Sequence, residues 1–425
     1  MIREIKRTNR IRGDIKAPGD KSISHRAIMC NALAKGDARI TNFLTGSDCL
    51  KTIDAFRELG VAIDVSKDEV IVHGKGLYSL EEPRHIIHAG NSGTTARLLT
   101  GILAGQKFNS IIDGDESLSR RPMARVIDPL TSMGGKFLAR HDKYLPINIF
   151  GSPLQGITYH MEVASAQVKS SIIFATLFAE GKSTIIEYIP SRNHTELLLK
   201  YMGASLSVDK EKIEVEGGRE LMAHDIYVQG DISSASYFIV AALIVKDAHL
   251  VIRNVNINDT RAGILAVLHR MGANISLENI RTDVETMADI IVESSELHGT
   301  EIGGAEVPTL IDELPIIAIA AMVANGMTTV RNAEELKVKE TNRIATICEM
   351  ITALGGNIES TEDGFVVTGS DSIKGGFVNA HGDHRIAMAG SIGGIITDEE
   401  THILDSECVD ISFPEFFDIL GEISE

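Results

Sequence analysis

Residues 51–60 read K-T-I-D-A-F-R-E-L-G, an amphipathic helical pattern that stops at a glycine. The same ending, Leu-Gly or Met-Gly between a helical and an extended segment, recurs along the chain at Gly60, Gly134, Gly203, Gly272, Gly355 and Gly421. A helix that leads into a strand favours a residue with left-handed dihedral angles just past its last turn, and glycine adopts these most easily. The recurrence predicts a strand–helix–glycine–strand unit repeated six times, the sixth copy being cut short by the end of the chain.

A second helix is expected upstream of each glycine-ended helix, and its composition is different. These upstream segments are rich in Ala, Ile, Ser and Gly, with almost no charge beyond the first turn, at residues 22–34, 91–104, 165–179, 233–245, 313–324 and 384–396. A helix without a solvated face is buried on all sides, whereas the glycine-ended helices carry Lys, Arg and Glu on one face. The sequence therefore predicts buried helices inside, with amphipathic helices and sheets outside.

Six units at a mean spacing of about 72 residues indicate two domains of three units each. The boundary is expected near Gly230, between the third and fourth units. A strand expected at residues 4–16 precedes the first unit, and on pattern alone it could belong to either half. A solenoid is the alternative, but solenoid repeats span about 20 to 50 residues, and a buried helix in every copy requires a closed core.

The composition limits the partners and the compartment. The 425 residues include 41 basic and 59 acidic side chains, a net charge of −18, which argues against nucleic acid and anionic membranes as partners. The cysteines show neither C-x-x-C spacing nor disulfide-scaffold density, which indicates a reducing compartment and no zinc site, at Cys30, Cys49, Cys348 and Cys408. The N-terminus lacks the apolar segment of a signal peptide, and no apolar run reaches the length of a membrane span. We therefore expect a cytoplasmic protein.

Polar residues without a packing role gather where the buried helices begin. In A-P-G-D-K-S-I-S-H-R, residues 17–26, we expect Lys21, Ser22 and Arg26 around the first turn of a helix, where backbone N–H groups and the helix dipole favour an anion. The other five helices begin with Asn91 to Thr94, Ser165 and Gln167, Asp231 with Ser233 and Ser234, Asp312 with Glu313, and Asp383 to Arg385. Each group alone is explained by an N-cap, but six together predict an anion-binding cleft if the helices of each half run parallel.

Two loops add to the expected anion site. Residues 90–95, G-N-S-G-T-T, open like a phosphate loop but lack the Lys-Ser/Thr ending of a nucleotide-binding loop. Arg120 and Arg121 come just before a proline, a stiff geometry that suits a bidentate hold on phosphate or carboxylate. A solvated arginine pair is the alternative.

Candidate proton-transfer groups lie in the second half. V-K-E-T-N-R places Lys339, Glu340 and Arg343 at the start of an expected helix, with the lysine and arginine four residues apart on one face. A weak surface ion pair is the alternative. Asp312 and Glu340 beside several cations would provide one group to take a proton from an alcohol and another to give one to a vinyl carbon.

These motifs jointly resemble those of the enolpyruvyl transferases, and within that family the enzymes that act on shikimate 3-phosphate. The matching motifs occur in order over nearly the whole chain: P-G-D-K-S-I-S-H-R, G-N-S-G-T, R-P-M-A-R-V, S-A-Q-V-K-S-S, D-E-L-P, V-K-E-T-N-R, H-G-D-H-R-I-A-M and S-F-P-E-F. The resemblance implies an α/β fold of two domains, each with three βαβαββ repeats around buried helices, an inside-out α/β barrel. It implies domains at residues 18–229 and at residues 1–17 with 230–425.

The resemblance also implies an activity: transfer of the enolpyruvyl group of phosphoenolpyruvate to the 5-hydroxyl of shikimate 3-phosphate by a monomer, without metal or organic cofactor. Shikimate 3-phosphate would be bound by Lys21, Ser22, Arg26, Ser165, Ala166, Gln167, Ser191, Asp312 and Lys339. Phosphoenolpyruvate would be bound by Lys21, Gly93, Arg121, Gln167, Arg343 and Arg385. The catalytic residues would be Asp312 as base, Glu340 as acid, and Lys21. Ala166 stands where many relatives have a second serine, so one hydroxyl to the shikimate phosphate is missing.

Two other functions are compatible with part of the pattern. The sister enzyme that acts on UDP-N-acetylglucosamine has a Lys-Asn pair in the first motif and a cysteine in the loop before R-P. Here Ser22 follows Lys21, and residues 115–121 contain no cysteine. A non-enzymatic anion-binding module is the second alternative, and it predicts that Asp312 and Glu340 are replaceable without loss of turnover.

Overall fold

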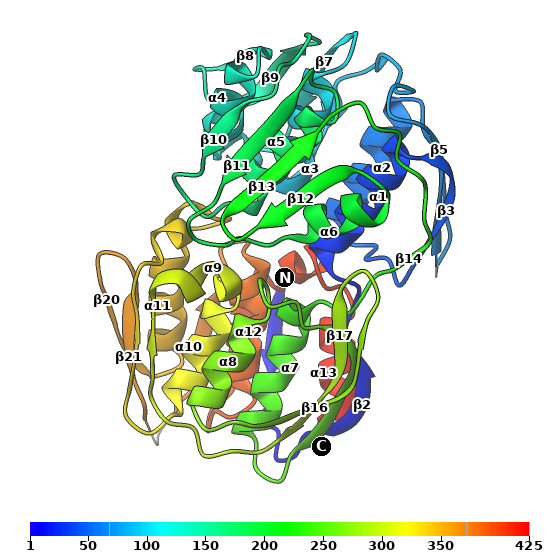
Figure 1. Ribbon diagram of the computed structural model, residues 1–425. Coiled ribbons are helices and arrows are strands. Elements are labelled where there is room, and N and C mark those ends of the chain that lie inside the picture. Colours follow the sequence, from blue (N-terminus) through cyan, green and yellow to red (C-terminus); the bar gives the residue numbers. More distant parts are fainter. Residues whose placement is uncertain (68, 371–372, 425) are drawn as a thin grey trace. The chain divides into compact units, whose positions relative to one another are not determined.

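The computed structural model describes residues 1–67, 69–370 and 373–424, and the chain divides into two compact units (Figure 1). The continuous unit is Gly19–Val228. The split unit combines Met1–Pro18 with the chain from Gln229 onward. Within both units, most repeats follow one order: strand, inner helix, strand, outer helix and two antiparallel strands.

The continuous unit holds three repeats. Its helices are α1 (Lys21–Leu33), α2 (Ser47–Glu58), α3 (Gly93–Ala104), η1 (Leu118–Arg120), α4 (Ala124–Ser132), α5 (Ala166–Thr176) and α6 (His194–Tyr201). Its strands are β3 (Lys35–Thr41), β4 (Ala62–Val65), β5 (Glu69–Lys75), β6 (Ile87–His88), β7 (Asn109–Asp113), β8 (Lys136–Arg140), β9 (Tyr144–Phe150), β10 (Thr158–His160), β11 (Lys182–Ile186), β12 (Ser205–Asp209), β13 (Lys212–Glu216) and β14 (Ile226–Tyr227).

The split unit holds the other three repeats. Its helices are α7 (Ile232–Ile244), α8 (Gly263–Arg270), η2 (Gly304–Glu306), α9 (Val307–Leu310), α10 (Leu314–Met322), η3 (Glu334–Val338), α11 (Arg343–Ala353), α12 (His384–Gly394), η4 (Ser406–Ile411) and α13 (Phe416–Ile423). Its strands are β1 (Ile2–Ile5), β2 (Arg12–Lys16), β15 (His249–Asn256), β16 (Asn274–Thr282), β17 (Thr286–Glu293), β18 (Glu301–Ile302), β19 (Met327–Val330), β20 (Asn357–Ser360), β21 (Phe365–Thr368), β22 (Phe377–Asn379) and β23 (Thr401–Leu404).

The predicted buried helices are confirmed as α1, α3 and α5 in one unit and α7, α10 and α12 in the other. Every residue of α10 is buried, and Figure 1 shows α7, α10 and α12 side by side inside the split unit. The outer helix α2 instead buries one face, with Cys49, Ile53 and Phe56 toward the core. Composition alone therefore separated inner from outer helices correctly.

The prediction that each outer helix ends at a glycine with left-handed dihedral angles is confirmed for five helices and wrong for the sixth. The residues after α2, α4, α6, α8 and α11 have φ between +82° and +99°, at Gly60, Gly134, Gly203, Gly272 and Gly355. Gly421, however, lies inside α13, which continues to Ile423. Ile423 is buried, and it lies beside Gly13 of β2, so two more helical residues are needed to bring it into the core.

The first repeat of each unit takes its first strand from a distant part of the sequence. In the remaining repeats, the strand before the inner helix pairs in parallel with the strand after it, as β6 does with β7. In the first repeat this place beside β3 is taken by β14, with Ile226 opposite Ile40. In the fourth repeat the place beside β15 is taken by β2, with Ile15 opposite Ile252.

The prediction of a single strand at residues 4–16 is wrong, because this segment contains parts of two strands, β1 and β2. β1 pairs with β23 in antiparallel fashion, whereas β2 pairs with β15 in another sheet of the same unit. The polar segment K-R-T-N-R at residues 6–10 separates the strands and contributes nothing to the buried core. β1 also completes the sixth repeat, whose described residues form a three-stranded sheet, while the other five sheets have four strands.

Candidate active site

Polar side chains cap most of the inner helices, as the N-cap alternative predicted. Hydrogen bonds join cap oxygens to backbone N–H groups at Asp20 and Ile23 (2.9 Å), Ser92 and Thr95 (3.1 Å), Ser165 and Val168 (3.4 Å), Asp231 and Ser233 (2.8 Å), and Asp383 and Arg385 (3.0 Å). α10 begins at Leu314 without a side-chain cap bond. The caps account for Ser92, Ser165, Asp231 and Asp383, so the remaining charged residues, Asp312 and the cations among them, are the first candidates for chemistry.

The first motif of the continuous unit places Lys21 and Arg26 on α1. Lys21 Nζ lies 3.0 Å from Asp48 Oδ2 on α2, and both side chains are partly shielded from water. Arg26 is 2% exposed, and it donates to Thr195 Oγ1 at 2.6 Å, to Ser170 Oγ at 3.0 Å and to the Ser22 carbonyl. Burial lowers the pKa of Arg26, because its hydrogen-bond partners among the described residues are neutral oxygens.

In the same unit, Gln167 of α5 contacts two residues of α3. Arg97 Nη1 donates to Gln167 Oε1 at 2.6 Å, and Gln167 Nε2 donates to Thr94 Oγ1 at 3.1 Å. A β-carbon built on Gly93 would lie 2.9 Å from Arg97 Nη1 and 3.6 Å from Arg121 Nη1. The glycine therefore lets the backbone approach two guanidinium groups closely.

The two arginines before the proline do not act as a pair. Arg121 donates to Asn91 Oδ1 and, at 3.2 Å, to Ser117 Oγ, so it faces the 90–95 loop. Arg120 instead pairs with Glu116, and its side chain is 76% exposed. The solvated alternative is correct for Arg120, because the 3-10 turn η1 directs the two neighbouring side chains to different surroundings.

Ser191 is held by a buried ion cluster. Glu187 accepts hydrogen bonds from the Ser191 hydroxyl and, at 3.0 Å, from its N–H. Lys169 is 1% exposed and lies 2.9 Å from Glu187 Oε2, 2.8 Å from Glu196 Oε1 and 3.1 Å from the Ser191 carbonyl. The turn that carries Ser191 is thus fixed on both its backbone and its side chain. Ser165 and Ala166, also predicted, are the N-cap and first residue of α5.

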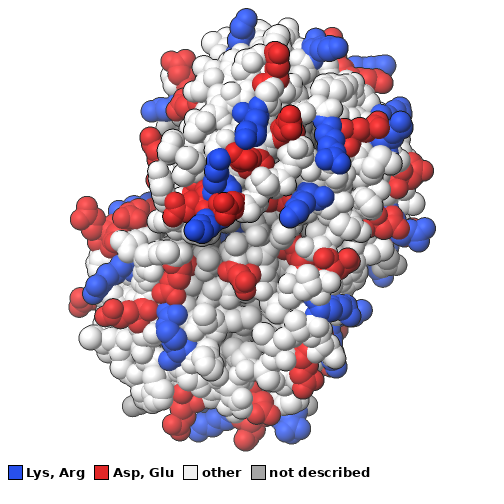
Figure 2. Space-filling model, viewed as in Figure 1, with Lys and Arg blue, Asp and Glu red and all other residues white. Residues whose placement is uncertain are grey.

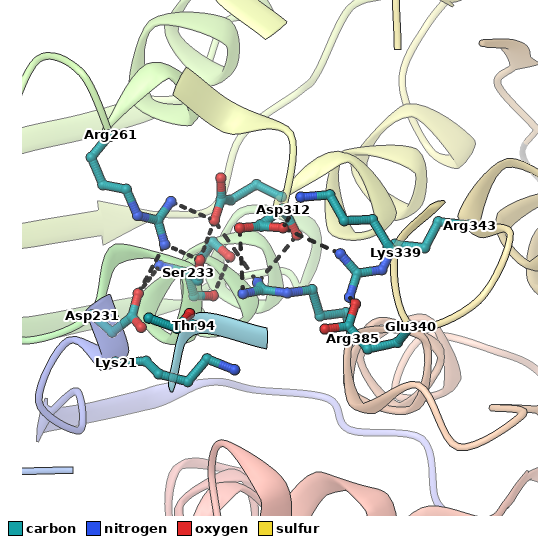
Figure 3. Close-up of polar contacts among 12 residues, drawn as sticks. Lys21, Thr94, Asp231, Ser233, Arg261, Asp312, Lys339, Glu340, Arg343 and Arg385 are labelled. Atoms are coloured by element: carbon teal, nitrogen blue, oxygen red, sulfur yellow. Dashed lines mark hydrogen bonds and ion pairs between the residues drawn. The ribbon is translucent and has the colours of Figure 1, made fainter. Parts of the chain in front are cut away.

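In the split unit, Asp312 is the centre of a charged group (Figure 3). Its Oδ1 lies 3.2 Å from Arg343 Nη1 and 3.4 Å from Lys339 Nζ, and its carbonyl accepts from Arg385 Nη1 at 3.2 Å. Arg343 also contacts Glu340, which brings the two predicted carboxylates onto one guanidinium. The expected helical face is wrong, because α11 begins only at Arg343; the shared contacts with Asp312 bring Lys339 and Arg343 together instead.

Burial and charge act in opposite directions on the two arginines of this group. Burial alone would lower the pKa of Arg343, but Asp383, Glu340 and Asp312 outweigh it and raise the pKa above its ordinary value. The same opposition raises the pKa of Arg385, where Asp312 is the strongest favourable charge. Both guanidinium groups therefore stay cationic at any physiological pH.

Arg261 donates hydrogen bonds to two carboxylates, one of which is the neighbour of Asp312 in the sequence. It is 1% exposed and donates to Glu313 Oε1 at 2.9 Å and to Asp231 Oδ1 at 3.1 Å (Figure 3). Glu313 follows Asp312 directly, and its Oε1 also lies 4.0 Å from Arg385 Nη1. Arg261 and Arg385 thus both compensate the negative charge of Glu313.

The partners of the predicted residues were not predicted from the sequence. They are Asp48, Arg97, Lys169, Ser170, Glu187, Thr195, Glu196 and Arg261. A signal existed for Arg97 and Lys169, since each is a charged residue in an inner helix that otherwise lacks charge beyond its first turn. No local pattern marks the others.

The described residues offer few features of other kinds of site. Within residues 1–67, 69–370 and 373–424, no group of three or more His, Cys, Asp or Glu side chains is placed to hold a metal ion. Among the helices described, none has the length and apolar character needed to cross a membrane. Cys30, Cys49 and Cys408 are buried, Cys348 is half-buried, and these four residues form no disulfide bond in the described structure.

Residues 5–420 match a family model described as EPSP synthase (3-phosphoshikimate 1-carboxyvinyltransferase). The 3-phosphoshikimate 1-carboxyvinyltransferase of Thermoanaerobacter sp. (strain X514) is 50% identical over 415 residues, which cover 97% of this chain and 98% of that protein. The protein of the same name from Bacillus subtilis (strain 168) is 47% identical over 418 residues, 98% of each chain.

Two solved structures are also similar to this chain over nearly its whole length. The EPSP synthase of Acinetobacter baumannii is similar with a TM-score of 0.89 and 40% identity, covering 100% of this chain and 98% of that one. The enolpyruvyl transferase NikO of Streptomyces tendae has a TM-score of 0.79 at 16% identity, over 99% and 97% of the two chains. The second likeness concerns the fold alone, and it confirms the predicted two-domain α/β class.

Proposed function

The chain belongs to the EPSP synthase family, the 3-phosphoshikimate 1-carboxyvinyltransferases, and from that premise we propose which residues carry out its reaction. The enzyme is a transferase that moves the enolpyruvyl group of phosphoenolpyruvate to the 5-hydroxyl of shikimate 3-phosphate and releases phosphate. The reaction lies on the shikimate pathway to chorismate and the aromatic amino acids. The hydroxyl oxygen adds to C2 of phosphoenolpyruvate while C3 gains a proton; the tetrahedral intermediate then loses phosphate from C2 and a proton from C3.

Shikimate 3-phosphate is assigned to Lys21, Ser22, Arg26, Ser165, Ala166, Gln167, Ser191, Asp312 and Lys339. The surroundings of Arg26 support this assignment most directly. A buried guanidinium whose described partners are neutral oxygens is stabilised by an anion, because its charge is otherwise compensated only at longer range. A phosphate near Arg26 would supply that compensation.

Phosphoenolpyruvate is assigned to Lys21, Gly93, Arg121, Gln167, Arg343 and Arg385. The close approach of the Gly93 backbone to the guanidinium groups of Arg97 and Arg121 supports the assignment. A phosphate or carboxylate at this point meets backbone N–H groups, a helix N-terminus and fixed cations together.

We assign the proton transfers to Asp312 and Glu340, with Lys21 as the third catalytic residue. The cations around Asp312 favour its carboxylate form, which a general base for the 5-hydroxyl requires. Glu340 contacts the other terminal nitrogen of the same arginine and is assigned the proton at C3 of phosphoenolpyruvate. The two carboxylates thus share Arg343 as a common support.

The domains, the compartment and the assembly state complete the proposal. We assign residues 18–229 to one domain and residues 1–17 with 230–425 to the other, and the division into continuous and split units supports this. Cytoplasmic location is supported by the four cysteines, which form no disulfide bond in the described structure and so suit a reducing compartment. Action as a monomer is checked by light scattering of the purified protein.

The match over residues 5–420 is the observation that carries the function, and phosphate release tests it. We expect release only when phosphoenolpyruvate and shikimate 3-phosphate are both present, and none with UDP-N-acetylglucosamine in place of the latter. Release with the nucleotide sugar would favour the sister enzyme, and no release with any acceptor would favour a binding module.

The catalytic assignments need variants of their own. Asp312→Asn and Glu340→Gln are each expected to lower kcat at least about 100-fold, as expected when a general acid or base is removed. Glu359→Gln is the matched control, because Glu359 is an exposed carboxylate on β20 of the same unit. Unchanged kcat in either test variant would remove that residue from the mechanism.

A further inference from the structure

A line of hydrogen bonds links three helices inside the continuous unit. His25 of α1 lies 2.6 Å from Thr52 Oγ1 of α2, measured from Nδ1. Thr52 Oγ1 lies 2.7 Å from Thr95 Oγ1 of α3, which donates to Ser92 Oγ at 2.8 Å. All four side chains are buried, with at most 1% exposed.

The protons in this line can run in only one direction. Ser92 Oγ, the cap of α3, accepts from both the N–H and the hydroxyl of Thr95, so the single hydroxyl proton of Thr95 is used. Thr52 must therefore donate to Thr95, which uses its own proton. The remaining bond requires His25 Nδ1 to be the donor to Thr52.

The other ring nitrogen of His25 agrees with this direction. Nε2 is buried and has no hydrogen-bond partner among the described residues. Burial, together with the charges of Lys21 and Arg26, lowers the pKa of His25 well below its ordinary value. A proton on Nε2 would lack an acceptor, so the ring is neutral with its hydrogen on Nδ1.

We propose that His25 is a positioning residue, whose Nδ1–H heads a chain of hydrogen bonds that fixes the start of α3 relative to the start of α1. The chain begins one helical turn after Lys21 and ends at Ser92, the residue before Gly93. Its function is to hold the Gly93 backbone at a set distance from the Lys21 ammonium. This role rests on the proposed function, in which both residues bind phosphoenolpyruvate.

Three variants test the chain. His25→Leu removes the donor, Thr52→Val removes the middle hydroxyl with little change in volume, and His25→Asn keeps an N–H at the position of Nδ1. An unpartnered buried group weakens the arrangement enough to change binding about tenfold. We therefore expect His25→Leu and Thr52→Val to raise KM for phosphoenolpyruvate about tenfold, with KM for shikimate 3-phosphate within about twofold of wild type and His25→Asn close to wild type.

The double variant His25→Leu/Thr52→Val separates a shared chain from two independent defects. Members of one hydrogen-bonded chain are not additive, so the double variant is expected to be no worse than the poorer single variant. Thermal unfolding by circular dichroism shows whether each variant is folded. Multiplicative effects, equal changes in the two KM values, or a His25→Asn variant as poor as His25→Leu would overturn the positioning role.

Histidine ¹⁵N chemical shifts test the proton direction without any substrate. In uniformly ¹⁵N-labelled wild-type protein at neutral pH, His25 is expected as the neutral Nδ1–H form. The Nε2–H form would overturn the chain. Absence of turnover in wild-type protein would instead remove the proposed function, and with it the positioning of substrate, while the ¹⁵N result would still decide the hydrogen bonds.

Discussion

Arg26 and Lys169 are both buried cations of the continuous unit, but their partners differ in charge. Lys169 lies between two carboxylates, Glu187 and Glu196, at 2.9 and 2.8 Å. Arg26 has hydroxyl and carbonyl oxygens instead. A cation compensated by its own protein stabilises the fold, whereas one with neutral partners retains affinity for an anionic ligand.

Replacement of Lys169 by methionine should therefore reduce stability. Lys169→Met leaves Glu187 and Glu196 buried without their cation, and breaking such a pair costs about 3–5 kcal/mol. The free energy of unfolding in urea measures this. Lys182→Met is the control, since Lys182 is half exposed and its pair with Glu214 should be worth under about 1 kcal/mol. Equal losses in the two variants would contradict the argument.

At the residue scale, the sequence could predict the charged groups but not their partners. The motif at the start of a helix predicts Arg26 as an anion-binding cation, yet its hydrogen-bond partner Thr195 lies 169 residues away in the sequence. Arg120 and Arg121 look equivalent in sequence, and only the turn η1 distinguishes the exposed side chain from the one facing Asn91. Such pairings depend on long-range packing, which no local pattern encodes.

At the scale of elements, the glycines after the outer helices show how far local chemistry predicts structure. The rule holds where a strand follows the helix, as at Gly203, which has φ +92°. It fails at Gly421, where the buried Ile423 keeps the helix going. Local dihedral preference therefore predicts helix ends until a tertiary contact requires otherwise.

The two glycines make a matched pair of substitutions. A β-carbon would meet nothing within 4 Å at either position, so a steric clash cannot cause a difference between the two variants. Gly203→Ala should destabilise the protein by about 1–2 kcal/mol, because alanine is strained at positive φ. Gly421→Ala should stabilise it by about 0.5–1 kcal/mol, because alanine is favoured within a helix. Chemical denaturation measures both, and shifts of the same sign would refute the explanation.

His73 joins three strands of one sheet and should make its stability depend on pH. On β5, its ring lies 2.9 Å from Asp37 of β3 and 3.2 Å from Asp64 of β4. Hydrogen bonds to Asp37 and Asp64 raise the pKa of His73 above its ordinary 6.5. A raised folded-state pKa means that the stabilisation is complete below about pH 6.5 and is lost as the pH rises through the higher value.

The melting temperatures of wild type and His73→Gln test this dependence. Their difference should be larger at about pH 5.5 than at about pH 9, and small overall, because His73 is only half-buried and both aspartates are exposed. His88→Gln serves as the control, since His88 is exposed on β6 and has no carboxylate partner among the described residues. A difference that grows with pH would show that the ion pairs do not stabilise the sheet.

At the scale of the whole molecule, the chain exchanges the first strands of its two units. The residue pattern alone left the N-terminal strand undecided between the halves, because β2 and β14 precede inner helices in the same way. Pairing resolves it: β2 lies beside β15, and β14 lies beside β3. The register of a parallel pair separated by more than 200 residues is set by packing of both strands, which local sequence does not specify.

This exchange predicts that the split unit folds only with both of its segments. Asp231 N donates to the Pro18 carbonyl at 2.8 Å, so residues 18 and 229 are close enough for a linker of about three Gly and Ser residues, each spanning up to about 3.5 Å. A chain joining residues 1–18 through this linker to residues 229–425 should unfold cooperatively in urea. Residues 229–425 alone should aggregate, because β15 then exposes an unpaired edge and the core loses Ile5, Ile11 and Ile15. Aggregation of the joined chain as well would show that the split unit depends on the continuous unit to fold.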